Sequence, residues 1–423
     1  MIDSGNTAWM LIATAMVLLM TPGLALFYGG MVRARSVLAM MMLSFGAIGV
    51  VAVAWPLWGY SLTFGESWLG GFVGNPATFA GLNGVDESAS LGAAAGVPFS
   101  VMAAFHGAFA IITVALISGA VADRVRFGPW LLFCAAWLTV VYAPIAHAVW
   151  GGGWASPGGA IAEALSTPID FAGGAVVHIN AGAAALAVAL IVGKRDGFGV
   201  VPFRPHHLPF VMLGSALLWF GWFGFNAGSA GAADAVAGRA FINTVIAPAA
   251  AMLAWLLVER IRDGKPTSLG AASGIVAGLV AVTPAASAVD SFGALAIGVA
   301  AGVLCALSVT LKYRFGFDDS LDVVGVHLVG GLVGTVLIGV FANLDEGSTW
   351  APDGALNGLL YGGDATQLIT QSLVAVFAMA LSFGITALVT ALIKATVGLR
   401  VSADVEQFSV DLAEHGEVAY DAS

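Results

Sequence analysis

The chain has 423 residues, of which 59% are hydrophobic and only 9% are charged. Soluble globular domains carry roughly 25% charged residues, so this composition excludes an ordinary soluble protein and indicates a membrane protein with several spans. The formal net charge of -10 argues against a nucleic-acid partner, because nucleic-acid binding requires a basic surface. Cys134 and Cys305 lie inside apolar runs, where neither a disulfide framework nor a metal-ligand spacing is visible. We expect both to be small core residues.

Eleven apolar runs are long enough to cross a membrane as helices, since a hydrocarbon core about 30 Å thick needs about 20 apolar residues. The expected spans are 7–31, 37–63, 98–122, 128–150, 171–193, 208–227, 240–258, 268–284, 291–311, 322–343 and 367–398. The predicted fold class is therefore an all-α membrane protein with eleven transmembrane helices, of which the eleventh is unusually long.

The positions of Lys and Arg indicate the orientation, because positive charge gathers on cytoplasmic loops. Fourteen of the 15 basic residues lie at alternate junctions between spans, and Arg239 is the exception. With an odd number of spans, this pattern predicts that the N-terminus lies outside and the C-terminus lies in the cytoplasm.

The opposing segments, 64–97, 151–170 and 344–366, contain no Lys or Arg. Their acidic residues include Glu66, Asp86, Glu87, Glu163, Asp345, Glu346 and Asp353. These residues either belong to solvated loops or create a field that concentrates cations at an outer vestibule.

An Asp and a His recur at the same spacing in the fifth and tenth spans. Asp170 precedes His178 by eight residues, and Asp319 precedes His327 by eight residues. The loop charges predict that these two spans run in opposite directions, which is typical of an inverted repeat of five plus five spans. Eight helical residues rise about 12 Å, so the two histidines are expected to meet near the membrane midplane.

The chain is accordingly predicted to divide into a membrane domain and a tail. The transmembrane domain covers residues 1–400, with repeat halves at about 1–195 and 208–343 and the eleventh helix at about 367–398. The charged residues 401–423 form a cytoplasmic C-terminal tail.

Four histidines are predicted to lie at membrane depth, where ionisable groups are costly and mark pathways or relays. His106 and His147, taken singly, are better interpreted as interhelical hydrogen-bonding residues. The symmetric placement of His178 and His327 favours a role in a pore, where one neutral ring donates a hydrogen bond and the other accepts one. Metal ligation is the rival interpretation, but no third or fourth ligand accompanies them at a recognisable spacing.

Several side chains near the outer ends of the spans suggest a cation site. Trp150 is either an interfacial belt residue or the ring that holds a small cation by cation–π attraction. Trp222, Phe225 and Ser229 are expected on one helix face, with the hydroxyl accepting an N–H and Phe225 closing a dry constriction. For Asp170, helix capping is favoured over direct cation binding.

Five segments resemble one known family when they are taken together in this order. They read AHAVWGGGW, DFAGGAVVHIN, WFGFNAGSA, DDSLDVVGVH and VDLAEHGEVAY, and ITVALISGAVADRVRF in the third span adds to them. The chain is similar to the ammonium transporter (Amt/Mep/Rh) family, on its bacterial Amt branch, over essentially all 423 residues.

The resemblance implies a homotrimer in a bacterial cytoplasmic (inner) membrane, with one ammonium- or ammonia-conducting pore in each subunit and no cofactor or enzymatic activity. The implied roles are recruitment by Phe105, Phe109, Trp150 and Ser229, an aromatic gate of Phe109 and Phe225, a pore centre of His178 and His327, and support by Asp170 and Trp222. His106 departs from the Gln of bacterial relatives, so its effect on the polarity of the outer site stays open. Methylammonium is the expected analogue, and the tail resembles the segment that meets PII-type nitrogen regulatory proteins.

Three functions remain in view at this point. The first is a transporter that recruits NH4+, deprotonates it and passes the neutral molecule along the histidines, because a bare cation in an apolar pore is far costlier than NH3. The second is an ammonium receptor that signals through its tail. The third is a membrane enzyme that uses the histidines with a metal.

Overall fold

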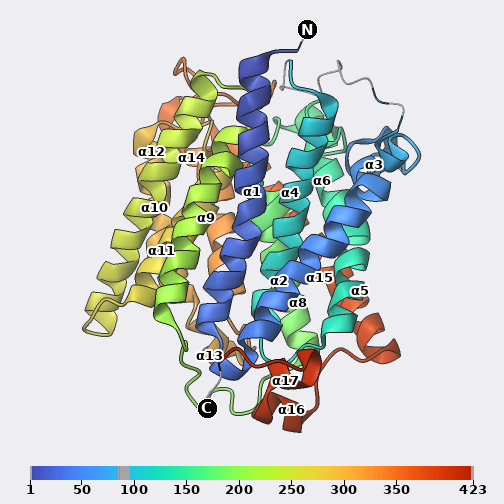
Figure 1. Ribbon diagram of the computed structural model, residues 1–423. Helices are drawn as coiled ribbons and strands as arrows, with labels where there is room; N and C mark the ends of the chain where they lie inside the picture. The colour runs from blue at the N-terminus through green and yellow to red at the C-terminus, as the bar shows by residue number, and fades with distance from the viewer. Residues whose placement is uncertain (1, 84, 86–95, 421–423) are drawn as a thin grey trace.

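The computed structural model describes residues 2–83, 85 and 96–420. In that described chain, eleven helical segments are long and apolar enough to cross a membrane, which confirms the predicted all-α fold with eleven spans. They stand side by side as a bundle with the two chain ends at opposite ends (Figure 1). Asp86 and Glu87, two of the acidic residues considered above, lie outside the described residues.

The spans are built from the following helices. The first five are α1 (Ser4–Met31); η1, α2, η2 and α3 (Ala34–Ser36, Val37–Ala54, Trp55–Gly59, Tyr60–Phe64); α4 and η4 (Phe99–Ile117, Ser118–Val121); α5, η5 and α6 (Phe127–Trp137, Leu138–Tyr142, Ala143–Trp150); and η6 and α8 (Gly174–Ile179, Asn180–Val192). The others are α9 (Leu208–Gly228); α10 (Ala235–Arg262); α11 and η7 (Ser268–Val282, Thr283–Ala285); α12 and α13 (Ser291–Ser308, Leu311–Phe315); η8 and α14 (Val324–Leu328, Val329–Phe341); and α15 (Ala365–Thr396).

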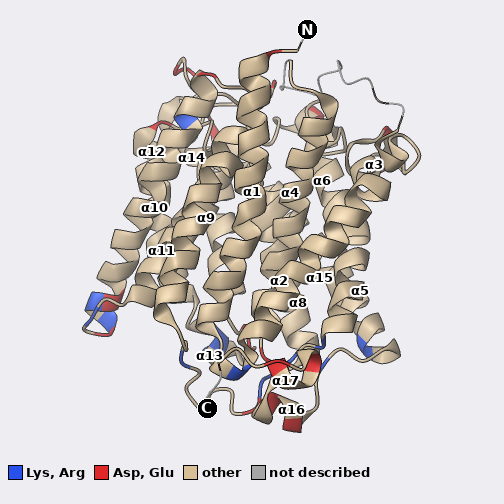
Figure 2. Cartoon of the chain, in the orientation of Figure 1, with Lys and Arg blue, Asp and Glu red and all other residues tan. Residues whose placement is uncertain are grey.

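Short elements lie between and after the spans. They are the antiparallel pair β1 (Ser67–Trp68) and β2 (Val73–Gly74), the turns η3 (Ala80–Leu82) and η9 (Leu359–Tyr361), and the helices α7 (Ala160–Ala164), α16 (Ala403–Phe408) and α17 (Val410–His415). Lys and Arg gather mainly at the end of the bundle that also holds α16 and α17, which we call the basic end (Figure 2). We call the other end of the helix bundle the opposite end.

The seventh span is longer than its predicted limits of 240–258. α10 begins at Ala235 because the Asp234 carboxylate accepts a hydrogen bond from the backbone N–H of Ala237 and caps the helix. Arg239 consequently lies within the first turns of this helix, where it forms an ion pair with Glu346. The one basic residue that departs from the charge pattern is therefore neutralised by an acidic partner.

The inverted repeat appears as recurring local structure in the fifth and tenth spans. Asp170 accepts hydrogen bonds from four successive backbone N–H groups, so the helix of the fifth span starts at Gly174 rather than at 171. Asp319 accepts two such hydrogen bonds at the start of the tenth span. In each case a π-helical segment follows, η6 or η8, and carries His178 or His327.

Two glycines let the histidine-bearing segments approach one another closely. A Cβ atom on Gly182 would lie 2.4 Å from the backbone nitrogen of Leu328, and one on Gly331 would lie 3.1 Å from the backbone nitrogen of Ile179. Small residues allow such contact between helix backbones in membranes. The fifth and tenth spans therefore contact one another directly beside the two histidines.

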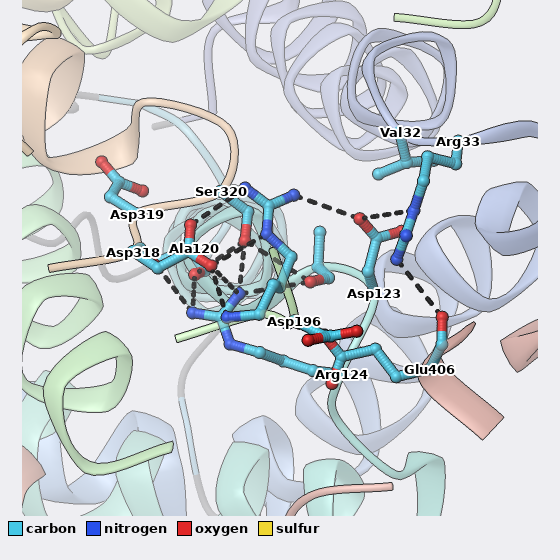
Figure 3. A network of polar contacts seen from close by, with 12 residues as sticks. Val32, Arg33, Ala120, Asp123, Arg124, Asp196, Asp318, Asp319, Ser320 and Glu406 are labelled. Carbon is cyan, nitrogen blue, oxygen red and sulfur yellow. Dashed lines mark hydrogen bonds and ion pairs between the residues drawn. The ribbon is translucent and has the colours of Figure 1, made fainter. Parts of the chain in front are cut away.

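A buried polar network joins distant segments at the basic end (Figure 3). Arg195 donates hydrogen bonds of 2.9 Å to both carboxylate oxygens of Asp318 and one of 3.1 Å to Asp123. Arg124 donates to the Asp318 carbonyl oxygen, and Arg33 forms an ion pair with Asp123 at 3.6 Å. The network thus links the ends of the first, third and fifth spans to the segment that enters the tenth span.

The network also determines the charge state of Asp318. Burial alone would raise the pKa of this carboxyl, but the hydrogen bonds and charge of Arg195, together with the charge of Arg124, outweigh burial and lower its pKa. An aspartate with a depressed folded-state pKa stabilises the fold fully above about pH 4, and this contribution is lost as the pH falls through the folded-state pKa.

We predict that Asp318→Asn destabilises the protein strongly at neutral pH, because it leaves the buried guanidinium of Arg195 without its main partner. Breaking a buried pair in this way costs about 3 to 5 kcal/mol. The measurement is the thermal unfolding midpoint of the purified protein at pH 7 and pH 5, where the loss should be the same. Asp263→Asn, which removes a carboxylate from an exposed pair with Arg262, is the control and should change little. Equal midpoints for Asp318→Asn and wild type would contradict the role of the network.

Candidate functional site

A cavity of about 720 Å³ enters the bundle from the opposite end. Its wall includes Phe105, Phe109, Trp150 and Ser229, which sequence reasoning assigned to recruitment, and His106. These residues come from α4, from the end of α6 and from the residue after α9. The structure therefore brings the five side chains to one cavity.

Trp150 is held in a fixed orientation at this wall. Its indole Nε1–H donates a hydrogen bond of 2.8 Å to the backbone carbonyl of Asp170, and the ring of Phe109 stands edge-on to it at 6.1 Å and 79°. Because the N–H group is already used, the aromatic ring is the part of Trp150 available to a ligand. The ring carries negative charge density on its faces, which attracts cations.

Ser229 and Asp170 show how the polar groups of the cavity are used. The Ser229 hydroxyl donates a hydrogen bond of 2.8 Å to the carbonyl of Phe225, which leaves lone pairs on its oxygen as acceptors. The Asp170 carboxylate is buried and accepts the four backbone N–H bonds that cap η6. Helix capping, the interpretation favoured from the sequence, is thus the geometry observed for Asp170.

Phe109 in the wall of the cavity stacks against Phe225, which does not itself line the cavity. The rings of Phe109 and Phe225 are stacked, with centroids 4.0 Å apart and an interplanar angle of 25°. Both side chains are buried, and Phe105 packs at 4.8 Å from Phe109. A closed aromatic stack therefore lies between the large cavity and His178.

The histidine pair lies directly beyond this stack. The His178 ring is 6.1 Å from Phe225, and its Nδ1 is 3.3 Å from Nδ1 of His327. Both histidines are buried, as is Trp222, whose ring lies 5.5 Å from that of His178. Trp222 is anchored by a hydrogen bond of 2.8 Å from its Nε1 to Thr283.

A small cavity of about 10 Å³ adjoins this pair. His178, His327, Trp222 and Phe225 contribute to its lining, together with apolar side chains. This is about the space that one water-sized molecule requires. The Nε2 atom of His178 is buried and has no hydrogen-bond partner among the described residues.

The other two histidines at membrane depth differ from each other. His147 contacts the Thr63 carbonyl through Nδ1 at 2.8 Å and the Ser67 hydroxyl through Nε2 at 3.0 Å, which matches its structural interpretation. The ring of His106 instead lines the large cavity and lies 4.4 Å from the ring of Phe64.

Sequence reasoning did not select several residues that line the large cavity. Tyr60, Phe64, Phe171 and Trp350 contribute aromatic rings to it. Phe171 directly follows Asp170 in the segment DFAGGAVVHIN, so the sequence offers a reason to expect Phe171 near the site. The others come from segments whose approach to the cavity depends on tertiary packing.

Within the described chain, no group of three or more His, Cys, Asp or Glu residues is placed to hold a metal ion. Cys134 and Cys305 are buried free thiols, as expected of small core residues.

Comparison with known proteins identifies the family. Residues 8–420 match the model of the Ammonium Transporter Family. A protein named ammonium transporter from Mycobacterium tuberculosis (strain ATCC 25618 / H37Rv) is 57% identical over 434 aligned positions, which cover 99% of this chain and 91% of that protein. The crystal structure of Saccharomyces cerevisiae Mep2 superposes with a TM-score of 0.87 at 36% identity, covering 100% of this chain and 92% of Mep2. A structure titled Sensor Amt Protein gives a TM-score of 0.85 at 28% identity, covering 97% and 98% of the two chains. This multi-pass membrane protein therefore belongs to the ammonium transporter family.

Proposed function

We propose that this protein recruits NH4+ at the large cavity, deprotonates it near the aromatic gate and conducts NH3 along the histidine pair. The observation that carries the proposal is the order of the parts: a wide cavity, then the Phe109–Phe225 stack, then His178 and His327. A cavity with an indole face suits a cation, whereas the narrow apolar stretch beyond it suits a small neutral molecule.

The recruitment step uses two groups of the cavity wall. The indole face of Trp150 attracts the cation, which is worth about 0.5 to 2 kcal/mol, and the Ser229 oxygen accepts one of its N–H bonds. Phe105 and Phe109 complete the aromatic wall, and His106 adds an imidazole to it.

The second step separates the proton from the permeant molecule. A bare ammonium ion between the apolar residues beyond the gate would lose its water without gaining a counterion, so the neutral amine is favoured there. The buried nitrogen atoms of His178 and His327 offer this amine hydrogen-bond partners where no water can accompany it.

The charge pattern supports an orientation with the basic end in the cytoplasm. Membership of the family with bacterial relatives supports a homotrimer in a bacterial cytoplasmic membrane. The tail is docked at that end, where the Asp411 carboxylate caps α2 through the N–H groups of Leu38 and Ala39 and Glu414 accepts the N–H of Phe127 at the start of α5. Because the tail contacts the ends of several spans, it is suited to pass a conformational change to them when a PII-type regulatory protein binds. The structure titled Sensor Amt Protein keeps a receptor function as the alternative.

For the orientation, we predict that cysteines in place of Glu163 and Lys265 react with a membrane-impermeant thiol reagent from opposite sides. Both positions are exposed, on α7 and in the loop after α10, whereas the native Cys134 and Cys305 are buried and provide the unreactive background. In intact cells Glu163→Cys should be labelled and Lys265→Cys should not, until the membrane is permeabilised. Labelling of both from outside would refute the proposed topology.

For recruitment, we predict that Trp150→Leu lowers the affinity for ammonium relative to sodium by about fivefold to thirtyfold, which corresponds to 1 to 2 kcal/mol of cation–π attraction. The measurement is competition of both ions against methylammonium uptake in proteoliposomes. Trp154→Leu is the matched control, because Trp154 packs against Phe377 rather than lining the large cavity. If both variants retain wild-type competition, Trp150 is an interfacial belt residue.

A further inference from the structure

Two carboxylates line the large cavity, and their surroundings differ. Asp170 is buried, and its oxygens accept hydrogen bonds from the backbone N–H groups of residues 173–176. Those four bonds occupy both of its oxygens and direct the carboxylate towards the start of η6. Asp353 also contributes to the cavity wall, but it is exposed. In the described chain, its carboxylate oxygens make no hydrogen bond or ion pair with another residue.

The backbone around Asp353 is nevertheless fixed in position. Its carbonyl oxygen accepts a hydrogen bond of 2.6 Å from the Thr167 hydroxyl, and the carbonyl of Gly354 accepts one of 3.0 Å from the Thr167 N–H. Three residues earlier, Trp350 donates its N–H to the Ser287 carbonyl at 2.8 Å. The loop between α14 and α15 therefore holds a free carboxylate at the rim of the cavity.

No positive charge of the cavity wall opposes this carboxylate. Of the described residues that line the cavity, none is Lys or Arg. Arg239, which lies at the same end of the bundle, is already paired with Glu346. When the charges that line a cleft all have the same sign, walls of low dielectric constant focus their electric field. This field raises the local concentration of counterions. Aromatic rings such as Phe171 and Trp350 provide such walls here.

We infer that Asp353 is the capture residue of the cavity, which draws NH4+ from solution to the rim before the cation reaches Trp150. The inference rests on the proposed function, because it assigns a step to the same cavity. It explains how a site whose deeper wall is aromatic can collect a hydrated cation. The attraction acts at a distance through the field, so it requires no direct contact between the carboxylate and Trp150.

The experiment measures initial rates of methylammonium uptake into proteoliposomes at about 0.01 M and 1 M ionic strength, where the Debye length is about 30 Å and 3 Å. At low ionic strength, Asp353→Asn should raise KM about threefold to tenfold with kcat unchanged, since steering acts on encounter with the cation. At high ionic strength, the variant and the wild type should have the same KM. Asp353→Glu keeps the charge and should behave as wild type at both.

Glu163→Gln is the matched control. It removes one exposed carboxylate from the same end of the bundle, but Glu163 does not line the cavity, so its KM should change less than that of Asp353→Asn. A KM for Asp353→Asn that equals the wild-type or Glu163→Gln value at low ionic strength would overturn the inference, as would a change that persists at high ionic strength. Wild-type protein that transports no methylammonium at all would instead overturn the proposed function.

Discussion

In the proposed function, removing a cation from water is the physical cost on which the roles of the two cavities depend. A charge placed in an apolar medium costs far more than a small neutral molecule with the same hydrogen-bonding groups. The protein has a wide cavity with polar atoms at one end. Beyond Phe109 and Phe225, a small cavity with space for about one water-sized molecule adjoins the histidine pair. In the proposed mechanism, the proton is therefore left behind at the boundary between these two regions.

The histidine pair depends on the backbone that carries it. Asp170 and Asp319 cap η6 and η8 from opposite ends of the bundle, and close approach at Gly182 and Gly331 places the two segments in direct contact. Each feature fixes the backbone that carries the imidazoles. The ion-pair network around Asp318 adds a second constraint at the basic end, because Asp318 immediately precedes the cap of the tenth span.

Sequence reasoning predicted the parts of this arrangement that local patterns encode. Asp170 precedes His178 by eight residues, and Asp319 precedes His327 by eight residues. In each case the spacing joins a capping residue to a histidine on the helical segment that it caps, so the sequence alone reveals the pattern. The buried state of Arg124 was not visible, because its partner Asp318 is 194 residues away and a basic residue in a short loop is usually solvated. Aromatic residues such as Tyr60 and Trp350 join the cavity only through tertiary packing, so no local pattern singles them out.

The central claim is tested most directly by the double variant His178→Leu/His327→Leu. The measurement is the ammonium flux into proteoliposomes that contain this variant. Two leucines keep the passage apolar but remove the hydrogen-bond partners at the point of greatest desolvation, so the account predicts that conduction stops while the protein still inserts and folds. The assembly state and the thermal unfolding midpoint of the same preparation show whether folded protein is present. Normal ammonium flux through folded, inserted double-variant protein would contradict the assignment of these histidines as the conduction centre.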